Sequence, residues 1–167
     1  VGVVSMERSS GYYHPSEIAS TMYCPFACAQ SRLKKPATYR KKPETSLILD
    51  IGHSLHAMIE RYLSQIYGDR CQTEVVSTFE PLHLSGRCDA LITLDNGAKQ
   101  VLEFKTKKSA SGMTAAKPEH VMQATCYEFI HGASFGSVVY LDKTFNKLIE
   151  FRHVFDFHIW EEVVNRV

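Results

Sequence analysis

The feature that most constrains this chain is a pair of strand patterns joined by a tight turn. Apolar and β-branched residues gather over about 84–94, and a second such run covers about 99–107. Asp95-Asn96-Gly97 stands between them, and Asn-Gly flanked by such runs is typical of a two-stranded hairpin. The segment therefore predicts two neighbouring antiparallel strands.

Three charged side chains are expected to meet on this hairpin. Residues two apart on a strand share a face, so Glu103 and Lys105 should point together while Phe104 points to the opposite side. The turn would fold Asp89 back toward them. Two converging carboxylates repel each other unless a cation lies between them, and oxygen ligands of this kind suit magnesium or manganese. The alternative is an exposed hairpin with solvated charges, since Glu-x-Lys on a strand is common by itself.

The rest of the chain alternates between helix and strand patterns. His14-Pro15-Ser16-Glu17 is a typical helix start, and apolar residues at three- and four-residue steps indicate a longer second helix. We expect helices at about 14–34, 46–67, 118–131 and from Asp156, strands at about 73–80, 137–141 and 148–155, and loops at 36–45 and 109–117. This order predicts an α/β (α+β) fold with a mixed sheet flanked by helices.

Length and composition are typical of one globular domain. A chain of 167 residues with 44% hydrophobic and 22% charged residues can bury a substantial core. No apolar run reaches the roughly 20 residues that span a bilayer, and the first residues do not form a secretion signal. The five cysteines lack the paired spacing of a disulfide framework, apart from Cys24 and Cys28. We therefore expect a cytoplasmic protein with reduced thiols and no membrane partner.

Basic residues gather in two stretches although the formal net charge is only +1. The first begins at the end of the expected first helix and contains no acid, and the second closes the expected strand at 99–107. Clustered lysines and arginines can contact phosphates. The candidate nucleic-acid-binding residues are Arg32, Lys34, Lys35, Lys107 and Lys108. The alternative for the first stretch is a solvated loop.

Four short motifs follow one another along the chain. They are Gly52-x-x-x-His56 on a helix, Gly86-x-x-Asp89 and Glu103-x-Lys105 on successive strands, and Gln123-x-x-x-Tyr127 on the next helix. In these motifs the chain resembles the RecB-like branch of the PD-(D/E)XK nuclease superfamily, a branch that includes phage exonucleases and CRISPR-associated nucleases. The resemblance covers most of the chain and implies a restriction-endonuclease-like core.

The resemblance implies a divalent-metal site. Its ligands would be the carboxylates of Asp89 and Glu103, the backbone carbonyl of Phe104 and the imidazole of His56. Imidazole is softer than carboxylate, so a site that includes His56 should accept Mn²⁺ or prefer it over Mg²⁺. The alternative for His56 is a half-buried surface histidine, and His53 competes for its role.

The same resemblance implies that Lys105 is the catalytic lysine. Gln123 and Tyr127, one helical turn apart, would complete the catalytic residues and position the lysine or the DNA strand. The alternative for these two is that they line the rim of a helix whose core face holds Val121, Phe129 and Ile130.

Some relatives hold a four-iron cluster, with one cysteine near the N-terminus and three beyond the Gln-x-x-x-Tyr helix. Cys24 matches the first of these positions. No cysteine follows Cys126, so an iron–sulfur cluster is not expected.

Taken together, the motifs predict a metal-dependent DNA nuclease, an exonuclease in DNA recombination, repair or phage DNA processing. Residues 1–167 would form a single nuclease domain, with 1–45 an N-terminal helical and basic-loop segment. Two alternatives stay open. One is a catalytically silent nucleic-acid-binding or assembly module of the same fold. The other is a nuclease active only in a larger complex with a helicase, recombinase or other DNA-processing protein. The expected setting is the cytoplasm of a prokaryote or a phage-infected cell, and the oligomeric state is open.

Overall fold

A five-stranded sheet forms the centre of the computed structural model, which describes residues 11–26, 29, 43–144 and 147–167. The strands are β1 (Cys71–Phe79), β2 (Leu84–Thr93), β3 (Lys99–Lys107), β4 (Phe135–Asp142) and β5 (Lys147–Val154). They lie in the order β1-β2-β3-β4-β5. All neighbours are antiparallel except β3 and β4, which run parallel. The predicted mixed sheet is confirmed.

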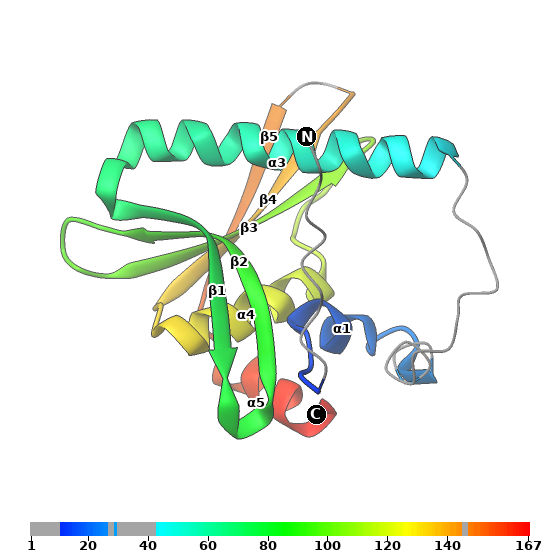
Figure 1. Ribbon diagram of the computed structural model, residues 1–167, viewed down its shortest axis with the longest axis vertical. Helices are drawn as coiled ribbons and strands as arrows, with labels where there is room; N and C mark the ends of the chain where they lie inside the picture. Colours follow the sequence, from blue (N-terminus) through cyan, green and yellow to red (C-terminus); the bar gives the residue numbers. More distant parts are fainter. Residues whose placement is uncertain (1–10, 27–28, 30–42, 145–146) are drawn as a thin grey trace.

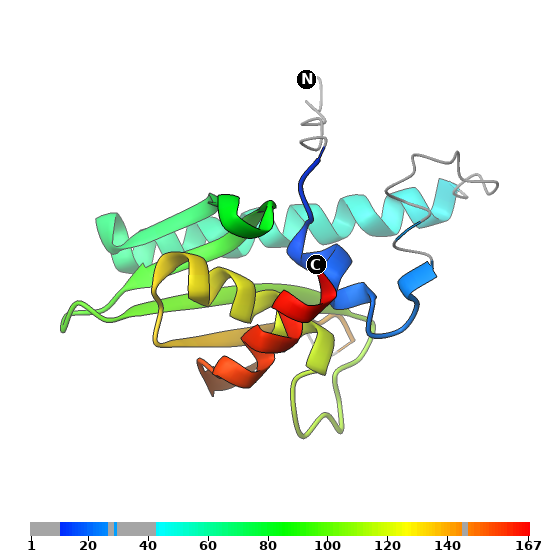
Figure 2. The ribbon, with the colours of Figure 1, turned by 90° about the horizontal axis from the view of Figure 1, so that it is seen from below.

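Helices cover both faces of this sheet, as Figure 1 shows. α3 (Pro43–Tyr67) crosses one face, and α4 (Pro118–His131) lies against the other. Parallel strands need a crossover connection, and α4 supplies it between β3 and β4. α1 (Pro15–Ser20) and α5 (Phe157–Arg166) pack against α4. Figure 2 shows the C-terminal end of α5 beside α1, where Arg166 donates a hydrogen bond to Thr21.

Neighbouring residues of β3 enter two different cores. Phe104 packs beneath α3, whereas Val101 packs with Ala124 of α4. Glu103 and Lys105 share the face of Val101, because strand side chains alternate. The predicted opposite orientation of Phe104 is confirmed, and the two charged side chains lie on the α4 side of the sheet.

Most of the predicted elements are confirmed. The strand at 99–107 and the helix at 118–131 agree with the prediction at both ends. In the hairpin turn, Gly97 has a φ of 80°, which glycine adopts without strain, and the N–H of Leu94 donates to the carbonyl of Ala98. The last helix is capped by Asp156, whose carboxylate accepts a hydrogen bond from the N–H of His158.

Two predicted boundaries are wrong. The spacing predicts a first helix that continues to about Lys34, but α1 ends at Ser20. Pro25 has no N–H to continue a helix, and its ring disfavours helical backbone in the residue before it. A loop is also predicted up to residue 45, but α3 already begins at Pro43. Proline is well tolerated at the first helical position, where its missing N–H is not needed.

The basic stretch that contains Arg32, Lys34 and Lys35 lies outside the described residues. Its predicted role in nucleic-acid binding therefore stays a prediction. Within the described part of the chain, no helix is long and apolar enough to cross a membrane.

Candidate active site

Asp89, Glu103 and Lys105 come together where β2 and β3 end their shared ladder. The β2–β3 pairing ends with Ala90 opposite Leu102, and Asp89 and Glu103 are the next residues on the two strands. One carboxylate oxygen of Asp89 accepts a hydrogen bond at 2.7 Å from the backbone N–H of Phe104 on β3. The ammonium of Lys105 lies 2.7 Å from Oε1 of Glu103. The structure thus gathers the three charged side chains at one end of the hairpin.

Lys105 is held between the sheet and α4. Its ammonium also donates to Oε1 of Gln123 at 3.0 Å. Burial raises the pKa of Tyr127 well above its ordinary value, although its hydrogen bond with Gln123 opposes this. Both residues are buried, so the alternative that they line the rim of the helix is wrong. A lysine ammonium has three N–H donors, and the third has no protein partner among the described residues.

The two motif glycines differ in how closely their neighbours approach. A Cβ at Gly86 would lie 2.8 Å from Cδ of Pro15 and 2.8 Å from the hydroxyl of Tyr127. Glycine is therefore needed at this position for α1 and α4 to reach β2. A Cβ at Gly52 would meet Oγ1 of Thr106 at 3.5 Å, which is ordinary van der Waals contact.

The surroundings of Asp89 and Glu103 disfavour the ionised form of both carboxyl groups. Burial first, and then the charge of Asp89, raise the pKa of Glu103 to about 8, although Lys105 opposes the shift. Burial also raises the pKa of Asp89, against the hydrogen bond from the backbone of Phe104. Oε2 of Glu103 is buried and has no hydrogen-bond partner. An unpartnered buried oxygen beside a second carboxylate is a donor set that a hard divalent cation would satisfy.

His56 lies on α3, which covers the face of the sheet opposite to Glu103 and Lys105. Its ring packs edge-on against Phe104, with the ring centres 6.0 Å apart. Burial lowers the pKa of His56, while the charge of Asp89 opposes the shift, and a neutral imidazole can coordinate a metal. Within the described part of the chain, no three histidine, cysteine or acidic side chains are gathered as a metal-binding group. The roles of His56 and of the Phe104 carbonyl as ligands therefore stay predictions.

A cleft of about 460 Å³ opens beside His56, and sequence reasoning missed two of its acids. It is lined by His53, His56, Ala57, Glu60, Glu74 and Arg87. Burial, and then the charge of Glu74, raise the pKa of Glu60 to about 7. Glu74 lies between the β1–β2 pairs Thr73–Ala90 and Val75–Cys88, and it has an unusual left-handed φ of 52°. Glu60 lies one helical turn after His56 in the sequence, and this spacing places it on the same face of the helix as His56. That spacing is a sequence signal for its place in the cleft.

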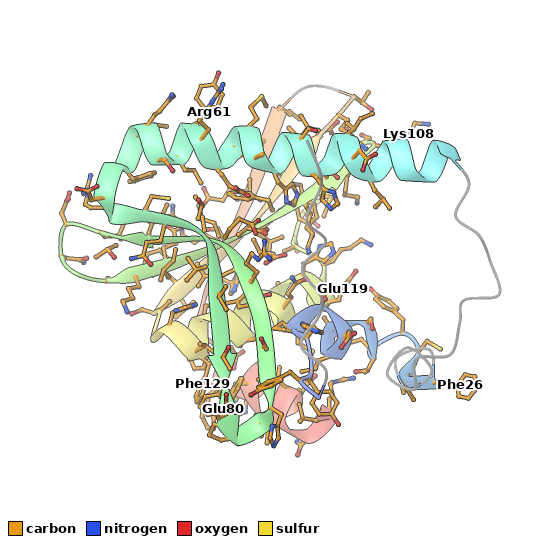
Figure 3. The ribbon with its side chains drawn as sticks, viewed as in Figure 1. Phe26, Arg61, Glu80, Lys108, Glu119 and Phe129 are labelled. Atoms are coloured by element: carbon orange, nitrogen blue, oxygen red, sulfur yellow. The ribbon has the colours of Figure 1, made fainter. Side chains whose placement is uncertain are left out.

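Lys107 and Lys108 follow Lys105 toward the end of β3. The ammonium of Lys107 lies 5.8 Å from the centre of the Tyr140 ring and donates to the sulfur of Met113 at 3.3 Å. Lys108 is exposed and is labelled in Figure 3. Their contact with nucleic acid stays a prediction.

Comparison with known proteins yields one curated relative. The chain is 30% identical over 95 residues to the CRISPR-associated exonuclease Cas4 of Saccharolobus solfataricus strain P2. The matched region covers 54% of this chain and 46% of that protein, so the chain spans less than half the length of its relative. No family model matches the chain.

Solved structures share the fold over nearly the whole chain. The complex of LHK-Exo with dAMP has a TM-score of 0.66 at 16% identity and covers 94% of this chain and 84% of that chain. LHK-Exo itself is described as an alkaline exonuclease from Laribacter hongkongensis. The structure of SSO0001 has a TM-score of 0.59 at 22% identity and covers 95% of this chain and 74% of that chain. The fold is thus that of exonuclease structures.

Proposed function

We propose that this chain is a member of the RecB-like branch of the PD-(D/E)XK nuclease superfamily and a divalent-metal-dependent deoxyribonuclease. It hydrolyses phosphodiester bonds, and it acts as an exonuclease in DNA recombination, repair or phage DNA processing. Residues 1–167 are proposed to form one nuclease domain.

One observation carries the proposal. The ammonium of Lys105 is fixed by Glu103 at 2.7 Å and by Gln123 at 3.0 Å, next to a buried carboxylate oxygen that has no partner. Oε2 of Glu128, which pairs with His153, is also buried without a partner, so this feature alone does not define a site. Glu103 differs because a second carboxylate, Asp89, and the ammonium of Lys105 act on it. Two carboxylates, an unpartnered oxygen and the free third N–H of the lysine suit a site that is completed by a cation and a substrate.

Each residue then has a distinct task. Asp89 and Glu103 would hold Mg²⁺ or Mn²⁺, with His56 and the Phe104 carbonyl as further ligands. The metal ion would supply a Lewis acid and lower the pKa of a bound water. Lys105 would donate a hydrogen bond to the phosphate oxygen on which negative charge develops.

Gln123 and Tyr127 act through the lysine. The amide of Gln123 fixes the direction of the Lys105 ammonium, and the buried hydroxyl of Tyr127 supports that amide from within the core. Lys107 and Lys108, together with Arg32, Lys34 and Lys35, would contact the phosphates of the strand.

DNA as the substrate and the exonuclease activity are supported by the names of the similar proteins. The second candidate function is a binding or assembly module that has lost its chemistry. The complete set of Asp89, Glu103 and Lys105 favours the enzyme. A helicase or recombinase partner and a higher oligomer stay open.

The experiment that tests the proposal is cleavage of end-labelled linear and closed-circular DNA, single- and double-stranded, in Mn²⁺, Mg²⁺ or EDTA. We expect loss of linear substrate that needs a metal ion and is absent in Lys105→Ala. Lys99→Ala, six residues earlier on the same strand, is the matched control. Loss of closed circles would show endonuclease action, and no cleavage by a folded wild-type protein would favour the binding module.

A further inference from the structure

His120, in the first turn of α4, has an imidazole nitrogen that the proposed chemistry does not use. Its Nδ1 lies 2.7 Å from the hydroxyl of Tyr140. The same hydroxyl accepts a hydrogen bond from the backbone N–H of Lys117 at 3.0 Å. Because this hydroxyl already accepts from Lys117, we assign its single hydrogen to the hydrogen bond with Nδ1, and in that tautomer the ring carries its own hydrogen on Nε2.

This Nε2–H is a neutral donor with no protein partner in the described part of the chain. Burial first, and then the charge of Lys105, lower the pKa of His120 to about 4. The ring is therefore uncharged at neutral pH. The His120 side chain is half-buried, so part of the ring is open to solvent.

The donor lies next to the proposed active site. The parallel register of β3 and β4 pairs Lys105 with Tyr140, so the two side chains share one face of the sheet. The ring of His120 lies over Tyr140, with the ring centres 5.6 Å apart. On α4, His120 precedes Gln123 by three residues and shares its face of the helix. A phosphate that followed the scissile one along a strand would thus meet His120 after Lys105.

An exposed aromatic ring lies beside the same end of α4. Tyr23, just beyond α1, is 69% exposed. Glu119 lies near its hydroxyl, and hydrogen bonding to this carboxylate raises the pKa of Tyr23. The charge of Glu119 is balanced by the ammonium of Lys117 at 3.4 Å. Figure 3 shows Glu119 beside α1. The contact with Glu119 involves only the hydroxyl of Tyr23 and leaves the ring exposed.

We propose that His120 and Tyr23 form a nucleotide subsite next to the scissile phosphodiester, in which His120 donates to a phosphate oxygen and Tyr23 stacks on a base. The inference rests on the proposed function and narrows its substrate to an unpaired DNA strand. Bases in a duplex are already stacked on their neighbours, whereas an unpaired base can stack on an aromatic side chain whatever its sequence.

The test measures the Kd of a short fluorescein-labelled single strand in EDTA, where no cleavage occurs. We expect Tyr23→Leu to weaken binding about 5- to 150-fold, the range for loss of one base–aromatic stack. His120→Ala should weaken it about 3- to 10-fold, and His120→Gln should retain most of the affinity because glutamine keeps a neutral N–H donor. The matched controls are Tyr62→Leu, an exposed tyrosine on α3, and His158→Ala, an exposed histidine on α5.

Modified strands separate a direct contact from a structural effect. A single abasic nucleotide, moved along the strand, should weaken wild-type binding at one position and have no further effect there in Tyr23→Leu. A single neutral methylphosphonate linkage, moved along the strand in the same way, should weaken wild-type binding at one position. At that position it should have no further effect in His120→Ala. If the loss of affinity from the substitution and the loss from the modified strand were additive at every position, the subsite would be overturned.

The outcomes for the subsite and for the nuclease are distinguishable. Metal-dependent cleavage by the wild type, with single-strand affinities of Tyr23→Leu and His120→Ala equal to those of the controls, overturns the subsite and leaves the nuclease standing. No cleavage by the wild type, with single-strand binding that depends on both residues, overturns the nuclease and keeps the subsite as part of a binding module.

Discussion

The ammonium of Lys105 lies 2.7 Å from Oε1 of Glu103, two residues earlier on the same face of β3. The glutamate side chain is almost fully buried, whereas the lysine side chain is one-quarter exposed. The pair therefore runs from the interior of the protein to its surface. Its acidic end can hold a cation away from bulk water, and its basic end can reach a substrate.

Replacement of this lysine should remove cleavage and keep the fold. We expect Lys105→Ala to lower kcat by about 100-fold or more, the usual effect of losing a donor to developing charge. Lys105→Arg should not restore it, because the larger planar guanidinium cannot occupy the same position between Glu103 and Gln123. Single-turnover cleavage in Mn²⁺, beside the Lys99→Ala control, measures the effect. A wild-type rate in Lys105→Ala would show that the site is elsewhere.

The two motif glycines should respond in opposite ways to a methyl group. Gly86→Ala forces a Cβ to 2.8 Å from Pro15 and from Tyr127, so we expect a loss of about 1–3 kcal/mol in the free energy of unfolding. Gly52→Ala meets only Thr106 at 3.5 Å within α3, and alanine is favoured over glycine in a helix by about 1 kcal/mol. It should therefore be neutral or stabilising. Urea unfolding of both variants gives the comparison, and equal effects would contradict the packing explanation for Gly86.

Much of this arrangement could be predicted from local pattern. The alternation of side chains on a strand fixes Glu103 and Lys105 on one face, and Asn96-Gly97 fixes the turn that returns Asp89. Such local rules need no knowledge of distant contacts. The length of α1 could not be predicted from apolar spacing alone, because that spacing continues to Phe26 and takes no account of Pro25.

The remaining features depend on contacts between residues far apart in the chain. His120 is an ordinary histidine in the sequence, and only the β3–β4 register brings Tyr140 beneath it. Glu74 lies in a strand pattern with no sign that its backbone adopts a left-handed φ. These positions follow from tertiary structure, which no short window of sequence contains.

A second buried acid, Glu128 of α4, makes a structural prediction away from the site. It is fully buried and lies 2.6 Å from Nε2 of His153 on β5, so the pair ties α4 to the edge of the sheet. Removing one partner leaves the other buried without compensation. We expect His153→Ala to lower the free energy of unfolding by about 3–5 kcal/mol and Glu128→Gln, which can keep the hydrogen bond, by much less.

Chemical denaturation measures this difference between the two buried variants. The exposed His158→Ala serves as control and should change stability by less than about 0.5 kcal/mol. If His153→Ala matched that control, the buried pair would contribute nothing to the fold.

The last prediction concerns the pH dependence of metal binding. In the folded protein the pKa of Glu103 is about 8, above its ordinary value of 4.5, so the folded state binds this proton more tightly than the unfolded state. The stability contributed by protonated Glu103 is fully present below pH 4.5 and is lost as the pH rises through about 8. Without metal, the melting temperature should therefore fall between about pH 5 and pH 8.

A divalent cation should reverse this fall, because it replaces the proton on Glu103 and satisfies the unpartnered Oε2. We expect Mn²⁺ to raise the melting temperature little at pH 6 and increasingly toward pH 9. Glu103→Gln carries no titratable proton at this position, so the metal-induced rise should largely disappear. The fall with pH should become smaller and should end near pH 7, because the raised pKa values of Asp89 and Glu60 contribute a fall of the same sign. Thermal unfolding at several pH values, with Mn²⁺ or EDTA, measures both effects. A metal-induced rise of equal size at every pH would mean that the cation binds without displacing this proton, and that Glu103 is not its ligand.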